Sequence, residues 1–318
     1  GFFLAVSLKE TLPTMDVAIL ERGERVLRKV KVSGGGRCNC TNTFRAVGDL
    51  KEVYPRGHRR MKRLMKGFSH EDAWQWWERH GVRLTAQDDE CVFPQAQDSH
   101  AIIDCLVSNA HRLGINILTG RGVSDISDLA GYDFIAVTTG GSLQAAAYEW
   151  LARIGHEIVP PIPSLFTFCI GDEPLHALMG LVTEARLHIP GTDFSASGAL
   201  LITHWGLSGP AALRLASYAA RHLAGSGYRS PVAINWSGMT VEEVAQRIKA
   251  VATSERNALV TNARAIDVPS RLWRHIVMRA LGDRKESGKS EATRALSDKA
   301  ESLRWLDLSK KQLNRLIE

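Results

Sequence analysis

The residues best suited to chemistry lie in a short glycine-rich segment, Ser33-Gly-Gly-Gly-Arg-Cys-Asn39. Three consecutive glycines let backbone N–H groups approach an anion such as a pyrophosphate, because no Cβ atom stands in the way. Arg37 adds a fixed positive charge with a planar set of donors. Asn39 and Asn42 offer both donors and acceptors, as the edge of a flavin ring requires. The segment therefore predicts a dinucleotide diphosphate site, and a glycine loop without a ligand is the alternative interpretation.

An acidic residue at the end of an apolar run points to the same kind of site. Residues 17–20 form a continuous apolar stretch of strand length, as expected of a strand buried on both faces of a parallel sheet, and Glu21 follows it. In dinucleotide-binding sheets, an acid at such a position accepts hydrogen bonds from a ribose. It lies about 20 residues after the last glycine of the fingerprint. Glu21 lies 20 residues after Gly1, so Gly1 fits that last glycine. A surface glutamate with no ligand is the alternative.

Other elements must position these residues. We expect a glycine-rich loop over 31–42 that is neither helix nor strand, and a strand over 132–141 that runs into a glycine turn. Ser69 is expected to cap a helix that ends near His80. Further helices are predicted over 1–10, 58–68, 98–113 and 142–154, and short strands over 82–84, 91–93 and 115–118.

Three prolines within residues 159–163 predict a domain boundary. Beyond it we expect strands over 165–170, 182–189, 199–203 and 232–236, a helix over 209–223, and helices from residue 240 onward with a polar turn over 283–289. Thr240–Glu243 and Ser309–Gln312 have capping-box spacing. The predicted division is 1–160 as a Rossmann-like FAD-binding domain, 161–238 as a β-rich part and 239–318 as a helical part.

The longer motifs together resemble a known family. Residues 17–23 and 31–42, followed in order by shorter matches at 92–98, 137–141 and 203–210, resemble bacterial NAD(P)/FAD-dependent oxidoreductases. Members of that family are described as aminoacetone oxidase-like or 3-dehydro-bile-acid reductase-like flavoproteins. The resemblance implies an α/β fold, in which a Rossmann-like FAD-binding domain carries an inserted β-barrel plus helical domain. It also implies a cytoplasmic FAD-dependent enzyme that transfers hydride between NAD(P)H or oxygen and an organic substrate.

The resemblance also assigns roles by position. Gly1 and Glu21 would hold the pyrophosphate and the ribose of the adenosine half, and the backbone of Val123 would meet the adenine. The residues along the diphosphate toward the flavin would be Ser33, Gly34, Gly35, Gly36, Arg37 and Asn39, with Asn42 nearby. A late glycine turn beside the cofactor would consist of Thr139, Gly140 and Gly141. The resemblance assigns no proton donor.

Compared with that family, the sequence shows neither the opening strand with its full glycine fingerprint nor the closing glycine-rich segment. The resemblance therefore implies an FAD domain that lacks both its ends. A folded remnant without cofactor is one alternative that follows from this comparison.

Composition excludes several other classes of protein. The chain has 318 residues, 44% of them hydrophobic and 23% charged, which is typical of a globular protein. No apolar run approaches the ~20 residues that span a bilayer, and residues 1–6 lack the features of a signal peptide. The five cysteines have no regular spacing, so we expect reduced thiols and no metal site.

The net charge of +6 equals that of one segment, residues 51–66, which contains seven basic residues and a single acid. Nucleic-acid binding through this segment, without catalysis, is a second alternative function. Because no aromatic platform is interleaved with these basic residues, the sequence favours a small-molecule substrate instead. Residues 206–210 resemble a serine-hydrolase elbow only superficially, since Pro210 replaces the last glycine. We expect His204 and Trp205 beside them to form a packed corner, and Cys91, Cys105 and Cys169 to lie in the core.

Overall fold

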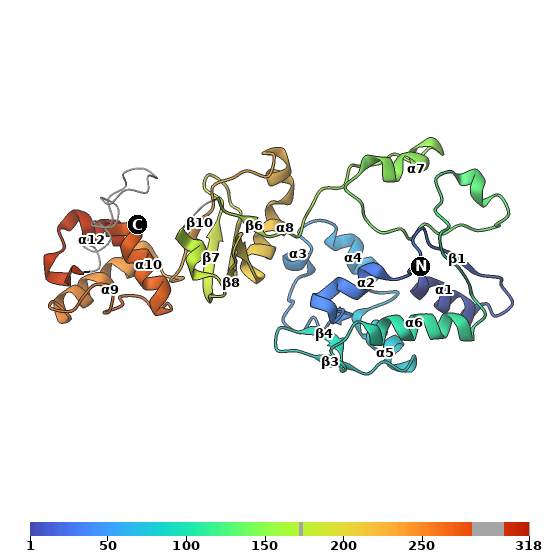
Figure 1. Cartoon of the computed structure of the whole chain (residues 1–318), viewed down its shortest axis with the longest axis horizontal. Coiled ribbons are helices and arrows are strands. Elements are labelled where there is room, and N and C mark those ends of the chain that lie inside the picture. Colours follow the sequence, from blue (N-terminus) through green and yellow to red (C-terminus); the bar gives the residue numbers. More distant parts are fainter. Residues whose placement is uncertain (172–173, 282–301, 318) are drawn as a thin grey trace. The chain divides into compact units, whose positions relative to one another are not determined.

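Two structural units make up the chain, residues 1–161 and 162–318, and the division falls within the proline-rich segment 159–163. The structure is a computed structural model, and it describes residues 1–171, 174–281 and 302–317. Figure 1 shows the elements of both units along the chain. The predicted polar turn over 283–289 lies outside the described residues. No helix in the described part is long and apolar enough to cross a membrane.

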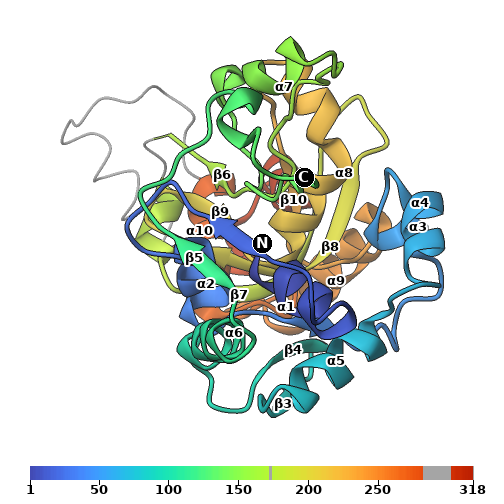
Figure 2. The ribbon, with the colours of Figure 1, turned by 90° about the vertical axis from the view of Figure 1, so that its right-hand side faces the viewer.

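The first unit contains a two-stranded parallel sheet. Strand β1 (Ala18–Leu20) pairs with β5 (Asn116–Leu118), with Ile19 opposite Ile117, and Figure 2 shows the two strands side by side. Helices α1 (Phe2–Thr11) and α6 (His100–Arg112) pack against each other beside this sheet. Their apolar faces meet in a core that includes Val6, Ile102 and Ala110. β1 is half-buried, not buried on both faces as the sequence predicts.

A small antiparallel sheet and several helices complete this unit. The sheet has the order β2 (Thr41–Asn42), β4 (Cys91–Pro94) and β3 (Leu84–Ala86). Ser69 caps α5 (His70–Arg79) as predicted, because its hydroxyl accepts from the Asp72 backbone and the Asp72 carboxylate accepts from the Ser69 backbone. The remaining helices are α2 (Arg28–Val32), α3 (Leu50–Val53), α4 (His58–Leu64) and α7 (Glu149–Arg153), with 3-10 turns at Ser33–Gly36, Ile126–Leu129 and Ala145–Tyr148.

Two local predictions in this unit are wrong. Residues 31–42 are not a uniform loop, since they contain the end of α2, a 3-10 turn and β2. The predicted strand over 132–141 does not form in the structure. A strand exists only through ladder hydrogen bonds with a neighbour, and no described strand pairs with this segment. Its apolar side chains are therefore exposed, Phe134 by 83%.

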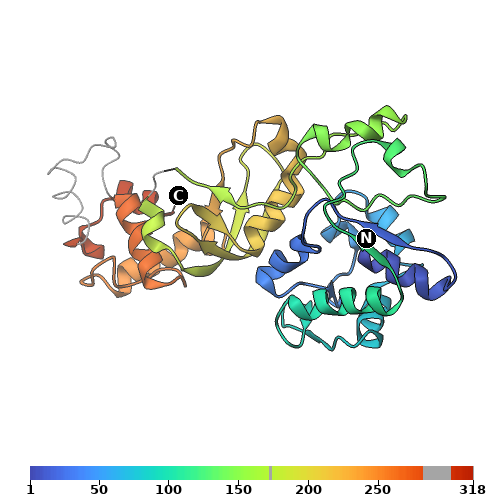
Figure 3. The ribbon, with the colours of Figure 1, turned by 45° about the vertical axis from the view of Figure 1, so that its right-hand side comes forward.

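The second unit is built on a five-stranded antiparallel sheet with the order β10-β7-β8-β9-β6. The longest pairing joins β7 (Val182–His188) to β8 (Ser195–Ile202) in a tight hairpin. The shorter strands are β6 (Phe168–Cys169), β9 (Gly206–Ser208) and β10 (Ala233–Asn235). Helix α8 (Pro210–Gly225) lies along β8 (Figure 3). Small residues such as Ala211 and Ala212 are fully buried there, which lets the helix approach the sheet closely.

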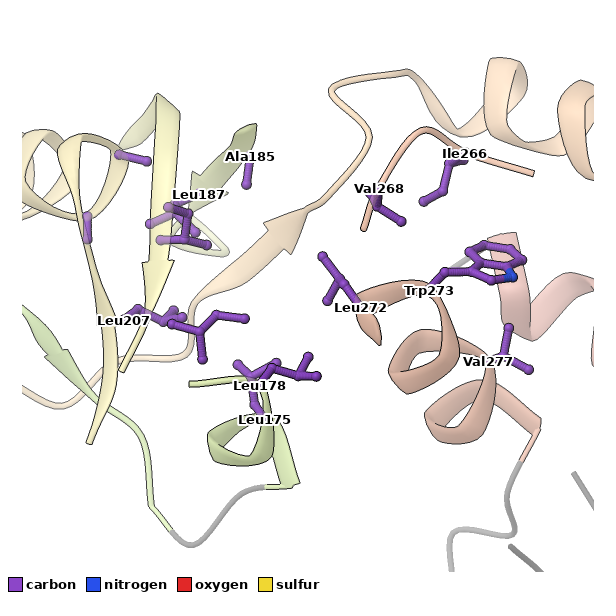
Figure 4. Close-up of a cluster of buried hydrophobic side chains, with 14 of the residues drawn as sticks. Leu175, Leu178, Ala185, Leu187, Leu207, Ile266, Val268, Leu272, Trp273 and Val277 are labelled. Atoms are coloured by element: carbon purple, nitrogen blue, oxygen red, sulfur yellow. The ribbon is translucent and has the colours of Figure 1, made fainter. Parts of the chain in front are cut away.

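A helical cluster continues the core of the second unit. It contains α9 (Val241–Ser254), α10 (Ser270–Leu281), α12 (Lys310–Ile317) and 3-10 turns at Pro174–Leu178 and Trp305–Asp307. The indole of Trp273 is buried and donates to the Val260 carbonyl at 2.7 Å. Figure 4 shows Leu175 and Leu178 together with Leu272 in this core. Both predicted capping boxes form, at Thr240–Glu243 and at Ser309–Gln312.

The backbone of segment 203–210 forms a corner in the structure, but His204 and Trp205 are exposed, Trp205 by 42%, so the expectation that these two residues pack is wrong. The Thr203 hydroxyl is buried and donates to the Gly206 carbonyl at 3.1 Å. Gly206 has a φ of 149°, and a Cβ atom there would overlap the Phe168 carbonyl oxygen. The segment therefore joins β8 to β9 and starts α8, and no catalytic elbow is present. Cys169 in β6 is exposed, so its predicted place in the core is wrong, and Cys91 is only half-buried.

Candidate functional site

The predicted glycine segment forms a tight left-handed turn at the end of α2. Gly34, Gly35 and Gly36 all have positive φ, at 56°, 68° and 85°. A Cβ atom on Gly34 would lie 2.8 Å from the Asn39 amide nitrogen, whereas one on Gly35 would meet nothing within 4 Å. Any side chain at position 34 would thus clash with the Asn39 backbone inside the turn, so glycine is required there. Gly35 leaves bare backbone facing open space, which is a feature that a bound anion can use.

Arg37 holds this turn to the small antiparallel sheet. Its guanidinium lies 4.1 Å from the centre of the Phe93 ring, a cation–π arrangement. Its Nη1 donates to the side-chain oxygens of Gln87 and Gln97, at 3.4 and 3.2 Å. Its Nε donates to the Gly34 carbonyl at 3.4 Å. Nη2 makes no hydrogen bond with the described residues. Arg37 therefore anchors the turn and can still donate from Nη2 to a ligand.

Buried polar contacts fix the start of the turn. The Ser33 hydroxyl donates to the Val30 carbonyl at 2.8 Å, so this predicted ligand is used within the fold. Ser99 is 1% exposed, and its hydroxyl donates to the Lys31 carbonyl at 2.9 Å. The Ser99 amide donates to the Gly36 carbonyl at 2.8 Å. Ser99 is therefore a supporting residue that the sequence analysis missed, and its position just before a helix was the available signal.

Glu21 and Val123 meet at the carboxyl ends of β1 and β5. The Glu21 carbonyl accepts from the Arg121 amide at 2.9 Å, which draws the loop that carries Val123 alongside it. One carboxylate oxygen of Glu21 accepts from the Gly23 amide at 2.7 Å. Its other oxygen has no partner among the described residues. Because ligands of open α/β sheets bind at the carboxyl ends of strands, this half-buried acceptor lies where a ribose would be held.

Gly1 and the late glycine turn lie next to the same strand. A Cβ atom on Gly1 would lie 3.3 Å from the Thr138 hydroxyl oxygen and 4.0 Å from Ile19 of β1. The ammonium group of Lys29 in α2 donates to the carbonyls of Thr139 and Gly141, at 3.4 and 3.3 Å. Gly140 between them has a φ of 72°.

The predicted site residues thus lie along one continuous path within the first unit. It starts at Glu21 and Val123, passes Gly1 and residues 138–141, and crosses through Lys29 to α2. From α2 it leads into the glycine turn. Lys29 is a second residue that sequence analysis missed, since a lysine on a short helix carries no distinguishing signal. The sequence analysis identified Glu21, Val123, Gly1, residues 139–141 and the glycine turn, but not Lys29, which links residues 139–141 to α2.

The residues that follow the glycine turn line an open pocket of about 400 Å³. This volume is within the usual range of small-molecule sites. One wall is the segment Asn39–Asn42 and another is the apolar side of α4. The complete lining is Asn39, Cys40, Thr41, Asn42, Phe44, Tyr54, Met61, Leu64, Met65, Phe68, Ser69, His70 and Ala73. The sequence predicts the apolar residues of α4 from helical spacing, but not that they line a pocket, and Leu64 is 57% exposed.

Aromatic and amide groups dominate the chemistry of this pocket. The rings of Phe44 and His70 lie 5.0 Å apart. The Asn42 side-chain oxygen accepts from the Phe44 amide at 2.7 Å, which leaves its NH₂ group as a donor. Asn39 is exposed at the same wall. No carboxylate belongs to the lining, so the pocket suits a flat, neutral or anionic ring with polar edges.

The opposite side of α4 is strongly basic. Arg59, Lys62 and Arg63 of α4, and Lys66 in the turn after it, are exposed, and none of them forms an ion pair within the part of the chain that the structure describes. On a helix these positions lie opposite Met61 and Leu64. The helix therefore separates an apolar pocket from a surface of uncompensated positive charge.

Three cysteines lie close to the glycine turn. Cys38 has a φ of 62°, and its amide donates to the Ser33 carbonyl at 3.0 Å. The pKa of the Cys38 thiol is lowered to about 6, chiefly by a hydrogen bond with Cys40, while that of Cys40 is raised. Burial raises the pKa of Cys91. All five cysteines are free thiols, and no cluster of metal-ligating side chains exists among the described residues.

Comparison with known proteins identifies the family. Residues 1–155 match the HI0933-like protein Rossmann domain, and residues 162–316 match the HI0933-like protein barrel and H2TH domain. The chain belongs to the HI0933-like family of flavoprotein oxidoreductases. The resemblance stated from the motifs is confirmed, and so is the fold class of a Rossmann-like domain combined with a barrel and helices.

Several curated relatives are similar over part of their length. The ribosomal RNA dihydrouridine synthase of Escherichia coli is 26% identical over 224 residues, covering 64% of this chain and 54% of the relative. That of Haemophilus influenzae is 25% identical, with 69% and 59% covered. The 3-dehydro-bile acid delta(4,6)-reductase of Clostridium scindens is 21% identical, with 70% and 59% covered. This chain thus spans little more than half the length of these relatives.

Proposed function

We propose that this member of the HI0933-like family binds FAD in its first unit and reduces an organic ring held in the adjoining pocket. The observation that carries the proposal is the continuity of the site. The path from Glu21 through the glycine turn ends at Asn39–Asn42, and these residues are also a wall of the pocket. A dinucleotide laid along that path would bring its redox-active ring to the substrate.

The residues present fit such a cofactor. The partnerless oxygen of Glu21 suits a ribose hydroxyl, which donates to it. The open backbone at Gly35 and the spare Nη2 of Arg37 suit the diphosphate. Helix α1 begins directly after Gly1, and the backbone amides of its first turn would also stabilise a bound anion. Asn39 and Asn42 would bond the polar edge of the ring.

The chain contributes binding and positioning to the reaction. FAD, when bound, supplies hydride transfer, with NAD(P)H or oxygen as its redox partner. Arg37 and the glycine backbone would hold negative charge, and α4 with Phe44 would exclude water from one side of the substrate. Tyr54 and His70 are two lining residues that carry exchangeable protons and would be candidates for donating one to a substrate there.

The pocket favours a base of single-stranded RNA as the ring to be reduced. An unstacked base stacks on an aromatic side chain and is read by amide groups, and its phosphates are bound by lysine and arginine. Phe44, His70 and Asn42 supply the first features, and the basic side of α4 supplies the last. Two of the relatives are named ribosomal RNA dihydrouridine synthase. This proposal departs from the small-molecule substrate that the sequence alone favours.

Exchange of three basic residues tests this substrate class. Replacing Arg59, Lys62 and Lys66 by Ala should weaken binding of a uridine-rich single strand. The slope of log K against log salt should fall by about 2, at roughly 0.7 per lost phosphate contact. Lys249, Lys310 and Lys311 in the second unit are exposed and serve as a control with the same change in charge.

The reaction itself is tested with the flavin-loaded full chain, NADPH and the same RNA under anaerobic conditions. We expect oxidation of NADPH and a gain of two hydrogens on a pyrimidine, measured by mass spectrometry of the digested RNA. If a steroid enone is reduced and the RNA is unchanged, the substrate is a small ring compound and not RNA. NADPH oxidation with neither substrate altered would contradict both.

A further inference from the structure

The Asn42 side chain is shared between the fold and the pocket. Asn42 ends β2, is half-buried and belongs to the lining of the pocket. Its side-chain oxygen accepts from the Phe44 amide at 2.7 Å, and its NH₂ group donates to no residue that the structure describes. Because an NH₂ group has two donors, one can meet the proposed cofactor while the other meets a substrate ring.

The contact with Phe44 fixes the direction of the Asn42 amide. If the amide were turned over, its NH₂ group would face the N–H group of Phe44, and two donors would meet at hydrogen-bond distance. Only the oxygen can occupy that position favourably. Asn42 therefore directs its donors, and not its oxygen, toward other partners.

The loop that follows β2 holds this contact in place. The Thr43 amide donates to the Glu90 carbonyl, and the Ala46 amide donates to the Glu90 carboxylate, both at 3.1 Å. Phe44 between them has a φ of 55°, a left-handed conformation that a phenylalanine keeps only where its surroundings impose it. The position of the Phe44 amide is thus set by the loop, and the Asn42 side chain follows it.

Other polar groups of the lining have no such fixed polarity. The hydroxyls of Tyr54 and Ser69 can each donate or accept, and the His70 ring can do either with its two nitrogens. Asn42 differs from them because the fold already uses its acceptor. A ring that enters the pocket therefore meets a donor of fixed direction at this wall.

We propose that Asn42 is a specificity-determining residue, which binds a ring carbonyl and disfavours a ring amino group at the same position. The inference rests on the proposed function, since it concerns the ring held in the pocket. A carbonyl oxygen accepts from the Asn42 NH₂ group. An amino group would place donor against donor and leave both without a partner, which weakens binding.

Uracil and cytosine differ in this way at the edge remote from the sugar. Both have a carbonyl beside the nitrogen that carries the sugar, but the remote edge has a carbonyl in uracil and an amino group in cytosine. With its phosphates on the basic side of α4, a nucleotide would have its sugar toward that helix. The remote edge would then face the wall formed by Asn39–Asn42. The inference therefore predicts that uracil binds better than cytosine.

The wild-type chain tests this preference without any substitution. The full chain, with FAD present, is titrated into fluorescently labelled hexamers of uridylate or cytidylate at one salt concentration. Fluorescence anisotropy gives the two dissociation constants. Because the phosphates are the same in both probes, their contribution cancels in the ratio. We expect uridylate to bind about tenfold more tightly than cytidylate.

The Asn42→Asp variant reverses the polarity of the group and keeps its structural contact. One carboxylate oxygen can still accept from the Phe44 amide, so the urea midpoint should stay close to that of the wild type. The other oxygen is an acceptor, which suits an amino group and repels a carbonyl. The preference for uridylate should therefore fall from about tenfold to none, or reverse. A residue that only holds the loop would leave the ratio unchanged.

The Asn116→Asp variant is the matched control. Asn116 is exposed at the start of β5 and does not belong to the pocket lining. Its substitution makes the same chemical change and adds the same charge to the same unit. Any weaker attraction for phosphates should affect both hexamers alike, so the preference for uridylate should persist in this variant.

Two results would overturn the inference and leave the proposed RNA substrate intact. One is equal, salt-dependent binding of both hexamers by the wild-type chain. The other is a folded Asn42→Asp variant that keeps the wild-type preference for uridylate. Failure of the wild-type chain to bind either hexamer would contradict the proposed RNA substrate itself, and the inference with it. The wild-type ratio is measured first, so the test does not depend on the folding of a variant.

Discussion

Glu21 has the most clearly defined role among the single residues of the site. One of its carboxylate oxygens is held by the Gly23 amide, and the other has no described partner. Hydrogen bonds to a charged group contribute about 1.5–3 kcal/mol. Glu21→Ala should therefore weaken FAD binding at least tenfold, measured by titration of flavin fluorescence. Glu24→Ala removes an exposed neighbouring charge and should leave the affinity unchanged. Equal affinity in both variants would remove Glu21 from the site.

The glycines of the turn differ in how much stability the protein should lose when each is replaced by alanine. Gly34→Ala should destabilise the protein by about 2 kcal/mol or more, because its Cβ would press on the Asn39 amide in addition to the left-handed strain. Gly35→Ala has only the strain and should cost about 1 kcal/mol. The urea midpoint measures both. If Gly35→Ala also weakens FAD binding while its stability loss is small, bare backbone at this position contacts the ligand.

The capping box of α5 is the best defined test at the scale of elements. Ser69 and Asp72 satisfy each other's backbone amides at 3.1 and 2.7 Å. Ser69→Ala should lower the free energy of unfolding by about 1 kcal/mol. Ser108 is exposed within α6, and Ser108→Ala should be neutral or slightly stabilising, since alanine is the better helix former. A similar loss in both variants would mean that the cap has no specific effect.

Elements with a complete local signal were predictable from the sequence. The helices over 1–10 and 98–113, the Ser69 cap and the two capping boxes form close to the expected residues, because their patterns depend on neighbours along the chain. The strand over 132–141 has an equally apolar sequence and does not form. Its existence depends on a pairing partner elsewhere in the chain, which no local pattern specifies.

The functional site shows the same division between local and long-range information. Glu21 and residues 33–39 are recognisable because their chemistry is contained within a short segment. Lys29 and Ser99 are not, since their roles come from carbonyl groups that folding brings to them. The pocket is formed by Asn39–Asn42 and the apolar side of α4, and the sequence indicates only that this side is apolar.

At the scale of the whole molecule, the two units match the two parts of one flavoprotein family. The candidate site lies within the first unit, where Lys29 links residues 139–141 to α2 and the glycine turn leads along the chain to the pocket wall. The second unit contributes a separate core of sheet and helices. The basic segment 51–66 belongs to the first unit, and it supplies Tyr54, Met61, Leu64 and Met65 to the pocket. That distribution links the proposed cofactor path to the proposed nucleic-acid substrate.

The most direct test of the central claim is the visible absorbance spectrum of the purified 318-residue chain, recorded before and after FAD is added and unbound FAD removed. We predict retained flavin bands, at close to one flavin per chain, which bleach when NADPH is supplied without oxygen. A folded chain that retains no flavin after this treatment would contradict the account. It would show that the path from Glu21 to Asn42 does not hold the cofactor.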